Sequence, residues 1–289
     1  METKFQIFER CAVGITAVSV GMCLAAFSVM GPLWLELIQY KTSPSAIYQL
    51  IGQDLVNLLF LSPLCVVGGV LRLTGNPRAK YFLIMTPLYL IYTALSYGMG
   101  MEWSHTAYTG NSEQFFFLYL WTLIGAFILL FDSLARFSNY QSGKNISKRL
   151  LTPYTIVFGL FLLMFAMMWL AEVGELINTG TSRGYEASPV AFWVVRYFDL
   201  GFTIPLGFIS IYLLWSRPRT SFPVQMLFYG FFITMGLAVN VMGLVMLFMG
   251  DPDWTLAGTM VFAGLLVIIA GGFFMVVKYG REKIADGTS

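Results

Sequence analysis

The sequence predicts an all-α integral membrane protein with eight transmembrane helices. Of the 289 residues, 57% are hydrophobic and only 11% are charged, whereas a soluble domain carries about 25% charged residues. Eight apolar stretches are long enough to span a bilayer, and the lysines and arginines gather in the loops of one side. A soluble enzyme, a nucleic-acid-binding protein and a fibre are excluded, because so few polar side chains cannot coat a water-soluble globule.

Each element is an apolar stretch of the length that a bilayer requires. A helix needs roughly 20 apolar residues to cross about 30 Å of hydrocarbon, where its backbone must satisfy its own hydrogen bonds. The predicted spans are 11–37, 47–71, 81–100, 115–134, 151–171, 190–215, 222–249 and 254–277. The first is too long for the apolar core of a secretory signal and is predicted to be retained. The connections are short, so residues 1–289 form a single membrane domain.

The basic residues predict the orientation, because cytoplasmic loops carry an excess of lysine and arginine. Of 17 such residues, 14 fall on the side that holds both termini, and only Lys41 and Arg183 fall on the other. Arg196 lies inside a span. We therefore expect a multi-pass protein of the plasma membrane with its N- and C-termini in the cytoplasm. The three cysteines lie in spans and predict no disulfide framework.

Two halves of the chain resemble each other, which predicts an internal repeat. The series Ser43-Pro44, Asp54-Leu55 recurs without a gap as Ser188-Pro189, Asp199-Leu200, and Pro63-Leu64 is answered by Pro205-Leu206. The predicted halves are 11–136 and 151–279. Because each half holds four spans, the copies point the same way in a parallel 4+4 arrangement.

Polar residues within the spans are the candidates for solute binding or proton coupling, because burying them in hydrocarbon is costly. They are Asp54, Asn57, Arg196, Asp199 and Asn240. Asp54 and Asp199 each lie about 15 Å along a helix from the Ser-Pro motif, at a rise of about 1.5 Å per residue. Arg196 precedes Asp199 by three residues, so the two are expected to share a helix face and to form an ion pair.

A second group of polar residues is predicted near the outer ends of the spans. Glu36, Glu172 and Glu175 lie at helix ends, and Glu102 and the only histidine, His105, lie in an outer loop. These five are candidates for the rim of one outward-facing polar pocket, although placement at the interface is the favoured explanation for the three glutamates. Pro63 and Pro205 lie inside spans and predict kinks. Asp132 and Arg136 are expected to form a surface pair without a functional role.

The series Arg196-Tyr197-Phe198-Asp199, Thr203, Pro205 resembles the third helix of microbial rhodopsins over ten residues. Those pigments hold retinal on a lysine of the last helix, whereas here the two spans that follow contain no lysine. No retinal Schiff base is therefore expected. A single histidine also excludes bis-histidine haem and a multi-histidine zinc site within this chain. No cofactor and no metal site are predicted.

The leading hypothesis is a transporter or channel-like protein whose outward-facing cavity binds a small cation or polar solute. The alternative is a non-catalytic subunit or scaffold of a larger assembly, for example a respiratory or quinone-associated one. A sensor or an intramembrane enzyme is a third reading, and an aspartyl protease is disfavoured because Asp54 lacks the Gly-x-Gly motif that precedes one aspartate of that family. The expected partners are the lipid bilayer, the solute and either a partner subunit or further copies of the chain.

Overall fold

The computed structural model describes residues 3–137 and 146–279. The protein is 80% helical, and these residues contain no strand, which confirms the all-α prediction. The helices are α1(Lys4–Met30), α2(Pro44–Val56), η1(Asn57–Leu61), α3(Ser62–Leu73), α4(Ala79–Leu83), α5(Pro87–Met99), η2(Ser112–Phe115), α6(Phe116–Ala135), α7(Lys148–Thr179), α8(Arg183–Ala187), α9(Pro189–Phe198), η3(Asp199–Thr203), α10(Ile204–Ser216), α11(Phe222–Phe248) and α12(Leu256–Tyr279). Several join end to end, so the described residues contain eight helices that are long and apolar enough to cross a membrane, as expected.

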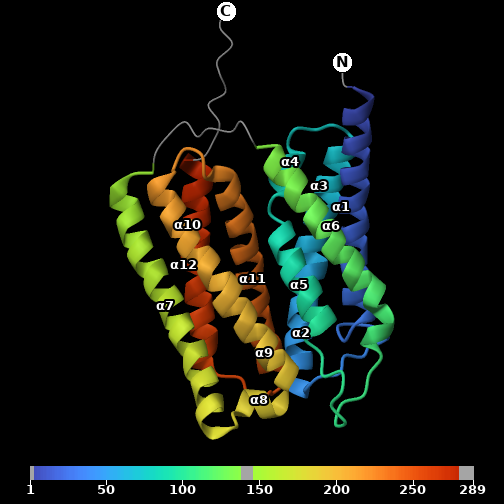
Figure 1. Ribbon diagram of the computed structural model, residues 1–289, viewed down its shortest axis with the longest axis vertical. Helices are drawn as coiled ribbons and strands as arrows, with labels where there is room; N and C mark the ends of the chain where they lie inside the picture. The colour runs from blue at the N-terminus through green and yellow to red at the C-terminus, as the bar shows by residue number, and fades with distance from the viewer. Residues whose placement is uncertain (1–2, 138–145, 280–289) are drawn as a thin grey trace, which may run out of the picture.

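The helices form two groups that lie side by side (Figure 1). In the first group α1 packs against α3 and α6, and α5 packs against α6; in the second group α7 packs against α10 and α12, and α11 packs against α12. The groups meet where α2 contacts α11 and where α5 contacts α9 and α11. α1 begins and α12 ends at the same end of the molecule, the terminal end, whereas α8 lies at the opposite, α8 end.

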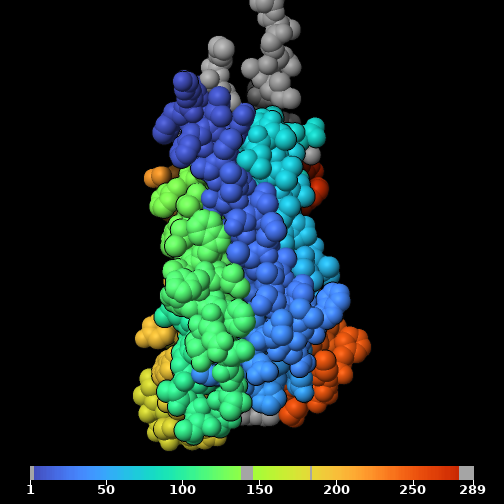
Figure 2. Space-filling view, turned by 90° about the vertical axis from the view of Figure 1, so that its right-hand side faces the viewer, coloured from blue at the N-terminus to red at the C-terminus, as the bar shows by residue number. Residues whose placement is uncertain are grey.

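Glycines allow helices to approach closely within and between the groups. Figure 2 shows α1 crossing one face of the first group between α6 and the segment of α2 and α3. A Cβ atom at Gly69 of α3 would lie 2.8 Å from the carbonyl oxygen of Gly14 in α1. At the contact between the groups, a Cβ atom at Gly52 of α2 would lie 2.5 Å from Cα of Met242 in α11. Small residues favour such contacts in membranes, where packing drives helix association.

The two prolines inside spans follow widened helical turns. The five-residue π-helices η1 and η3 each end two residues before a proline, Pro63 and Pro205 respectively. A proline removes one backbone hydrogen bond and clashes with the carbonyl four residues earlier, and a wider turn relieves that clash. A π-helix therefore precedes each of these prolines, and the kinks stay a prediction.

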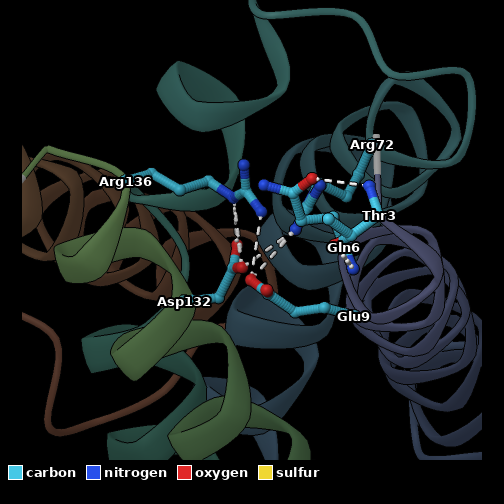
Figure 3. A network of polar contacts seen from close by, with 6 residues as sticks. All are labelled: Thr3, Gln6, Glu9, Arg72, Asp132 and Arg136. Atoms are coloured by element: carbon cyan, nitrogen blue, oxygen red, sulfur yellow. Dashed lines mark hydrogen bonds and ion pairs between the residues drawn. The ribbon is translucent and has the colours of Figure 1, made fainter. Parts of the chain in front are cut away.

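An ionic network joins three helices at the terminal end; it contains the expected pair of Asp132 with the exposed Arg136 and adds the buried Arg72 (Figure 3). The Asp132 side chain on α6 is only 5% exposed, and its Oδ1 lies 3.1 Å from Nη2 of Arg72 on α3, which is 6% exposed. Arg136 contacts the other carboxylate oxygen at 3.0 Å, and Glu9 on α1 lies 3.5 Å from Arg72. The sequence could not reveal this network, because Arg72 is 60 residues away from Asp132.

Candidate functional site

A cavity of about 440 Å³ lies mainly in the second group of helices and borders α2 and α5 of the first. Its lining begins at the α8 end with Thr42 and Trp254 and continues to Ile204 in α10 and Ile269, midway along α12. The walls are largely aromatic and apolar, with Phe165, Trp169, Phe232 and Phe262 among the lining residues. Cavities of this size and lining are typical of small-molecule sites.

The floor of the cavity is closed by buried polar contacts on the side of the terminal end. Tyr154 of α7 and Tyr229 of α11 share a hydrogen bond, and a Cβ atom at Gly272 of α12 would lie 2.6 Å from the Tyr229 hydroxyl. Ser210 of α10 donates to Oε1 of Gln225 at 2.6 Å. These residues lie beyond the deepest lining residues of their helices, so they separate the cavity from the terminal end.

Asp199 lines the cavity as the first residue of η3. Its Oδ1 accepts a hydrogen bond from the Thr203 hydroxyl at 3.1 Å, and the side chains of Tyr92 and Trp169 also face the carboxylate. No lysine or arginine belongs to the described lining, where the other acid is Asp253, close to Trp254. The described lining therefore offers carboxyl groups and aromatic rings but no basic side chain.

Arg196 does not form the expected ion pair with Asp199. Its guanidinium group instead pairs with Glu172 of α7 and lies over the rings of Phe192 and Trp169, at 3.9 and 4.5 Å from their centroids. The spacing of three residues is compatible with a pair, but α7 supplies a carboxylate and an aromatic surface that compete for the guanidinium. Asp199 therefore forms no ion pair with a lysine or arginine of the described residues.

Asn240 lines the cavity, as a solute-binding candidate should. Its Nδ2 donates to the carbonyl oxygens of Gly236 at 2.7 Å and Phe262 at 3.1 Å, so its amide group also ties α11 to α12. Only the Oδ1 atom remains as a polar group for a solute. Asn240 thus combines a structural role with a place in the wall.

Asp54 and Asn57 do not belong to the cavity. Both are fully buried in the first group, where the Tyr97 hydroxyl donates to Oδ1 of Asp54 at 2.6 Å. Gln53, one residue earlier, does line the cavity, and its Nε2 donates to Thr93 at 3.3 Å. Neighbouring residues of a helix point about 100° apart, so α2 presents Gln53 to the cavity and Asp54 to the first group.

The five rim candidates do not line the cavity. Glu102 is buried and accepts hydrogen bonds from the backbone N–H groups of Val190 and Ala191, at 2.9 and 3.3 Å, so it caps α9 from the other group of helices. Glu172 pairs with Arg196, as described above. Glu36, His105 and Glu175 are exposed. A helix cap and an ion pair thus involve Glu102 and Glu172, and the other three side chains lie on the surface of the described chain.

The sequence analysis missed the polar face of α5 and the residues around Asp199. Tyr92, Trp169 and Thr203 face the Asp199 carboxylate, and Tyr97 contacts Asp54. A signal for α5 is present, because Tyr89, Thr93 and Tyr97 recur at the four-residue spacing that places them on one helix face. Spacing alone does not distinguish this face from aromatic residues at a membrane boundary, where tyrosine and tryptophan are common.

The fold and the cavity define a polytopic α-helical membrane protein with a deep pocket at one end. Among the residues that the structure describes, no three histidine, cysteine, aspartate or glutamate side chains gather in a way that could hold a metal ion. The chain matches no protein-family model, and no curated protein and no solved structure matches it.

Proposed function

We propose that this protein binds a small organic cation in its cavity and moves it across the plasma membrane. The observation that carries the proposal is the setting of Asp199, a carboxylate that lines an aromatic-walled cavity without a contacting cation. A cationic solute would supply the missing positive charge. The carboxylate would fix the charged head, and aromatic side chains of the cavity wall such as Phe165 and Phe232 would stabilise it through their ring faces.

The direction of opening rests on charge. Arg72, Arg78, Lys80, Arg149 and Arg217 belong to the helix ends and connections at the terminal end. By the positive-inside rule, that end faces the cytoplasm. Both termini are then cytoplasmic, and the cavity opens to the outside at the α8 end. The Tyr154–Tyr229 and Ser210–Gln225 contacts would form the barrier on the cytoplasmic side.

The two groups of helices support the proposed repeat of 11–136 and 151–279. In each, the second span has a serine N-cap, a proline in its first turn and a π-helix. Two contacts between the groups are also equivalent under the repeat: α2 contacts α11, and their counterparts α9 and α5 contact each other. Two copies related by an axis along the membrane normal would make such contacts. Ser188 further contacts Thr42 and Ser43, at 3.4 and 3.3 Å.

The π-helices supply a register for the proposed repeat that differs from the one set by the Ser-Pro motifs. α2 has 13 residues before its π-helix, and α9 has 10. Asn57 and Asp199 are each the first residue of a π-helix, so they occupy equivalent positions. In that register Asp54 corresponds to Arg196 rather than to Asp199. The proposed halves would therefore have diverged in their polar residues.

The test compares choline with 3,3-dimethyl-1-butanol, in which a neutral carbon replaces the quaternary nitrogen. The melting temperature of the protein in nanodiscs is measured with each compound, because a ligand at 100 times its Kd adds about 2.7 kcal/mol to the native state. We expect at least one of two cations, choline and the larger tetraethylammonium, to raise the melting temperature. The neutral compound should have little effect. Asp199→Asn should abolish the shift, whereas Glu175→Gln, which changes an exposed acid outside the cavity, should retain it.

Equal shifts with the charged and neutral compounds, or a shift that survives Asp199→Asn, would refute the assignment of Asp199. No shift with either cation would favour the scaffold or subunit hypothesis, and co-purification of a partner subunit would then be sought. If the shift is found, uptake of labelled choline into proteoliposomes separates transport from binding alone.

A further inference from the structure

A second polar cluster lies outside the cavity, in the core of the first group of helices. It consists of Asp54 on α2, Ser28 on α1, Asn57 at the start of η1 and Tyr97 on α5, all with 0% exposure. The Tyr97 hydroxyl donates to Oδ1 of Asp54. The second carboxylate oxygen, both polar atoms of the Asn57 amide and the Ser28 hydroxyl have no hydrogen-bond partner. Buried polar groups without partners are rare and require an explanation.

Three other acids with buried side chains each have a cationic partner or a backbone donor, although Oδ2 of Asp251 is also without a partner. Asp132 lies between Arg72 and Arg136, Glu102 accepts two backbone N–H groups, and Asp251 accepts the backbone N–H of Asp253 at 2.8 Å. Among the described contacts, Asp54 has neither a cationic partner nor a backbone donor. An acid that served only to hold helices together would be expected to have one of the two.

The titratable groups around Asp54 are all tyrosines. Tyr97 and Tyr89 face it from α5, Tyr119 from α6 and Tyr40 from the segment between α1 and α2. From α1 and η1 only the uncharged Ser28 and Asn57 face the carboxyl group. No lysine, arginine or histidine is among these neighbours, so the charge of an ionised Asp54 has no protein counter-charge nearby.

We propose that Asp54 is a proton-binding site that the protein loads and unloads. The proton bonds to Oδ2, which converts the carboxylate to a carboxylic acid and changes no other bond. Asn57 and Ser28 suit both states, because an amide and a hydroxyl group can each donate and accept. The Asn57 carbonyl accepts from the protonated acid, and its NH₂ group, together with the Ser28 hydroxyl, donates to the carboxylate.

The tyrosines connect this site with the α8 end. Gly31 follows the last residue of α1. A Cβ atom built there would lie 3.0 Å from Oδ2 of Asp54 and 3.6 Å from Cε2 of Tyr40. The carboxylate oxygen that has no partner therefore faces the end of α1 and Tyr40. The Tyr119 hydroxyl donates to that of Tyr40 at 3.4 Å. Tyr119 in turn lines a surface pocket of about 290 Å³ with Glu113. This pocket is the entry point for water and protons.

The site is placed so that it can communicate with the cavity through one turn of α2. Gln53 lines the cavity, Asp54 follows it on another face, and η1 begins at Asn57. π-helices often occur at functional sites. Proton binding would thus alter the same turn that contacts the solute; this coupling, unlike proton binding itself, rests on the proposed function.

The test is pH-difference infrared spectroscopy of the purified full chain in nanodiscs. As the pH is lowered, we expect a C=O stretching band of a protonated carboxylic acid to appear. Asp54→Asn should lose this band, and the matched variant Asp199→Asn should keep it. Asn57→Ala should retain the band at a shifted frequency, because the hydrogen bonding of the acid changes; this variant also serves if Asp54→Asn does not fold.

An unchanged spectrum in folded Asp54→Asn, or in Asn57→Ala, would overturn the proposal. A band of Asp54 that persists at every pH at which the protein stays folded would also overturn it, because the proton would then be permanent. The choline-dependent melting shift is measured separately in Asp54→Asn. A choline-dependent shift that is retained in Asp54→Asn, in a protein whose unsubstituted form shows no pH-dependent Asp54 band, would reject the proton site while leaving the solute site intact.

Discussion

Replacing Asp132 with asparagine should reveal how much the buried ionic network contributes to stability. Arg72 and Asp132 are 6% and 5% exposed, and their charged atoms lie 3.1 Å apart. Removing one partner of a buried ion pair costs about 3–5 kcal/mol, because the other charge stays buried without compensation. Glu9 remains 3.5 Å from Arg72, so we expect Asp132→Asn to lower the free energy of unfolding by about 3 kcal/mol, the lower end of that range.

The assay is reversible unfolding by SDS in bicelles, followed by tryptophan fluorescence. Glu9→Gln is the matched control, because Glu9 is 44% exposed and an exposed pair contributes at most about 1 kcal/mol. The double variant Arg72→Met/Asp132→Leu should recover most of the loss, since it leaves no stranded charge. An effect of Asp132→Asn no larger than that of Glu9→Gln would refute the claim that the network is buried and coupled.

Two further substitutions test the contact between the groups and the role of Arg196. Gly52→Ala places a Cβ atom 2.5 Å from the Met242 backbone, so we expect a loss of about 1–3 kcal/mol from overpacking; Gly201→Ala, which meets nothing within 4 Å, should be neutral or slightly stabilising in the same unfolding assay. Arg196→Ala should lower the free energy of unfolding by only about 1 kcal/mol, because the Glu172 side chain that loses its partner is 38% exposed. The choline-dependent melting shift should remain. Loss of that shift would show that Arg196 acts on the solute.

The eight spans could be predicted because the signal for a membrane helix is local. Each stretch needs only enough apolar residues in succession, whatever it packs against. Pro63 and Pro205 predict kinks for a similar reason, since each proline disturbs the helix in which it lies. The π-helix before each proline was not predicted, because a kink and a wider turn relieve the same clash.

The partners of the charged residues could not be predicted, because partner choice depends on helices that are distant in the sequence. Local spacing suggested Arg196 with Asp199 and Arg136 with Asp132. The first was wrong because Glu172 on α7 lies closer to the guanidinium. The second pair exists, but Asp132 also pairs with the buried Arg72 of α3. Two opposite charges three or four residues apart on a helix can therefore form an ion pair, but a residue of another helix can replace either partner.

The distribution of polar contacts along the second group of helices argues for a route rather than a closed pocket. The cavity occupies the half near the α8 end, and beyond its floor the helices are held by hydrogen bonds between Tyr154 and Tyr229 and between Ser210 and Gln225. A static binding protein could fill that region with apolar side chains, which pack without donors or acceptors that must be satisfied. Hydroxyl and amide groups can instead exchange their partners for water when helices separate. The proposed transport step is therefore a separation of α7, α10 and α11 at this floor, while Asp199 holds the solute above it.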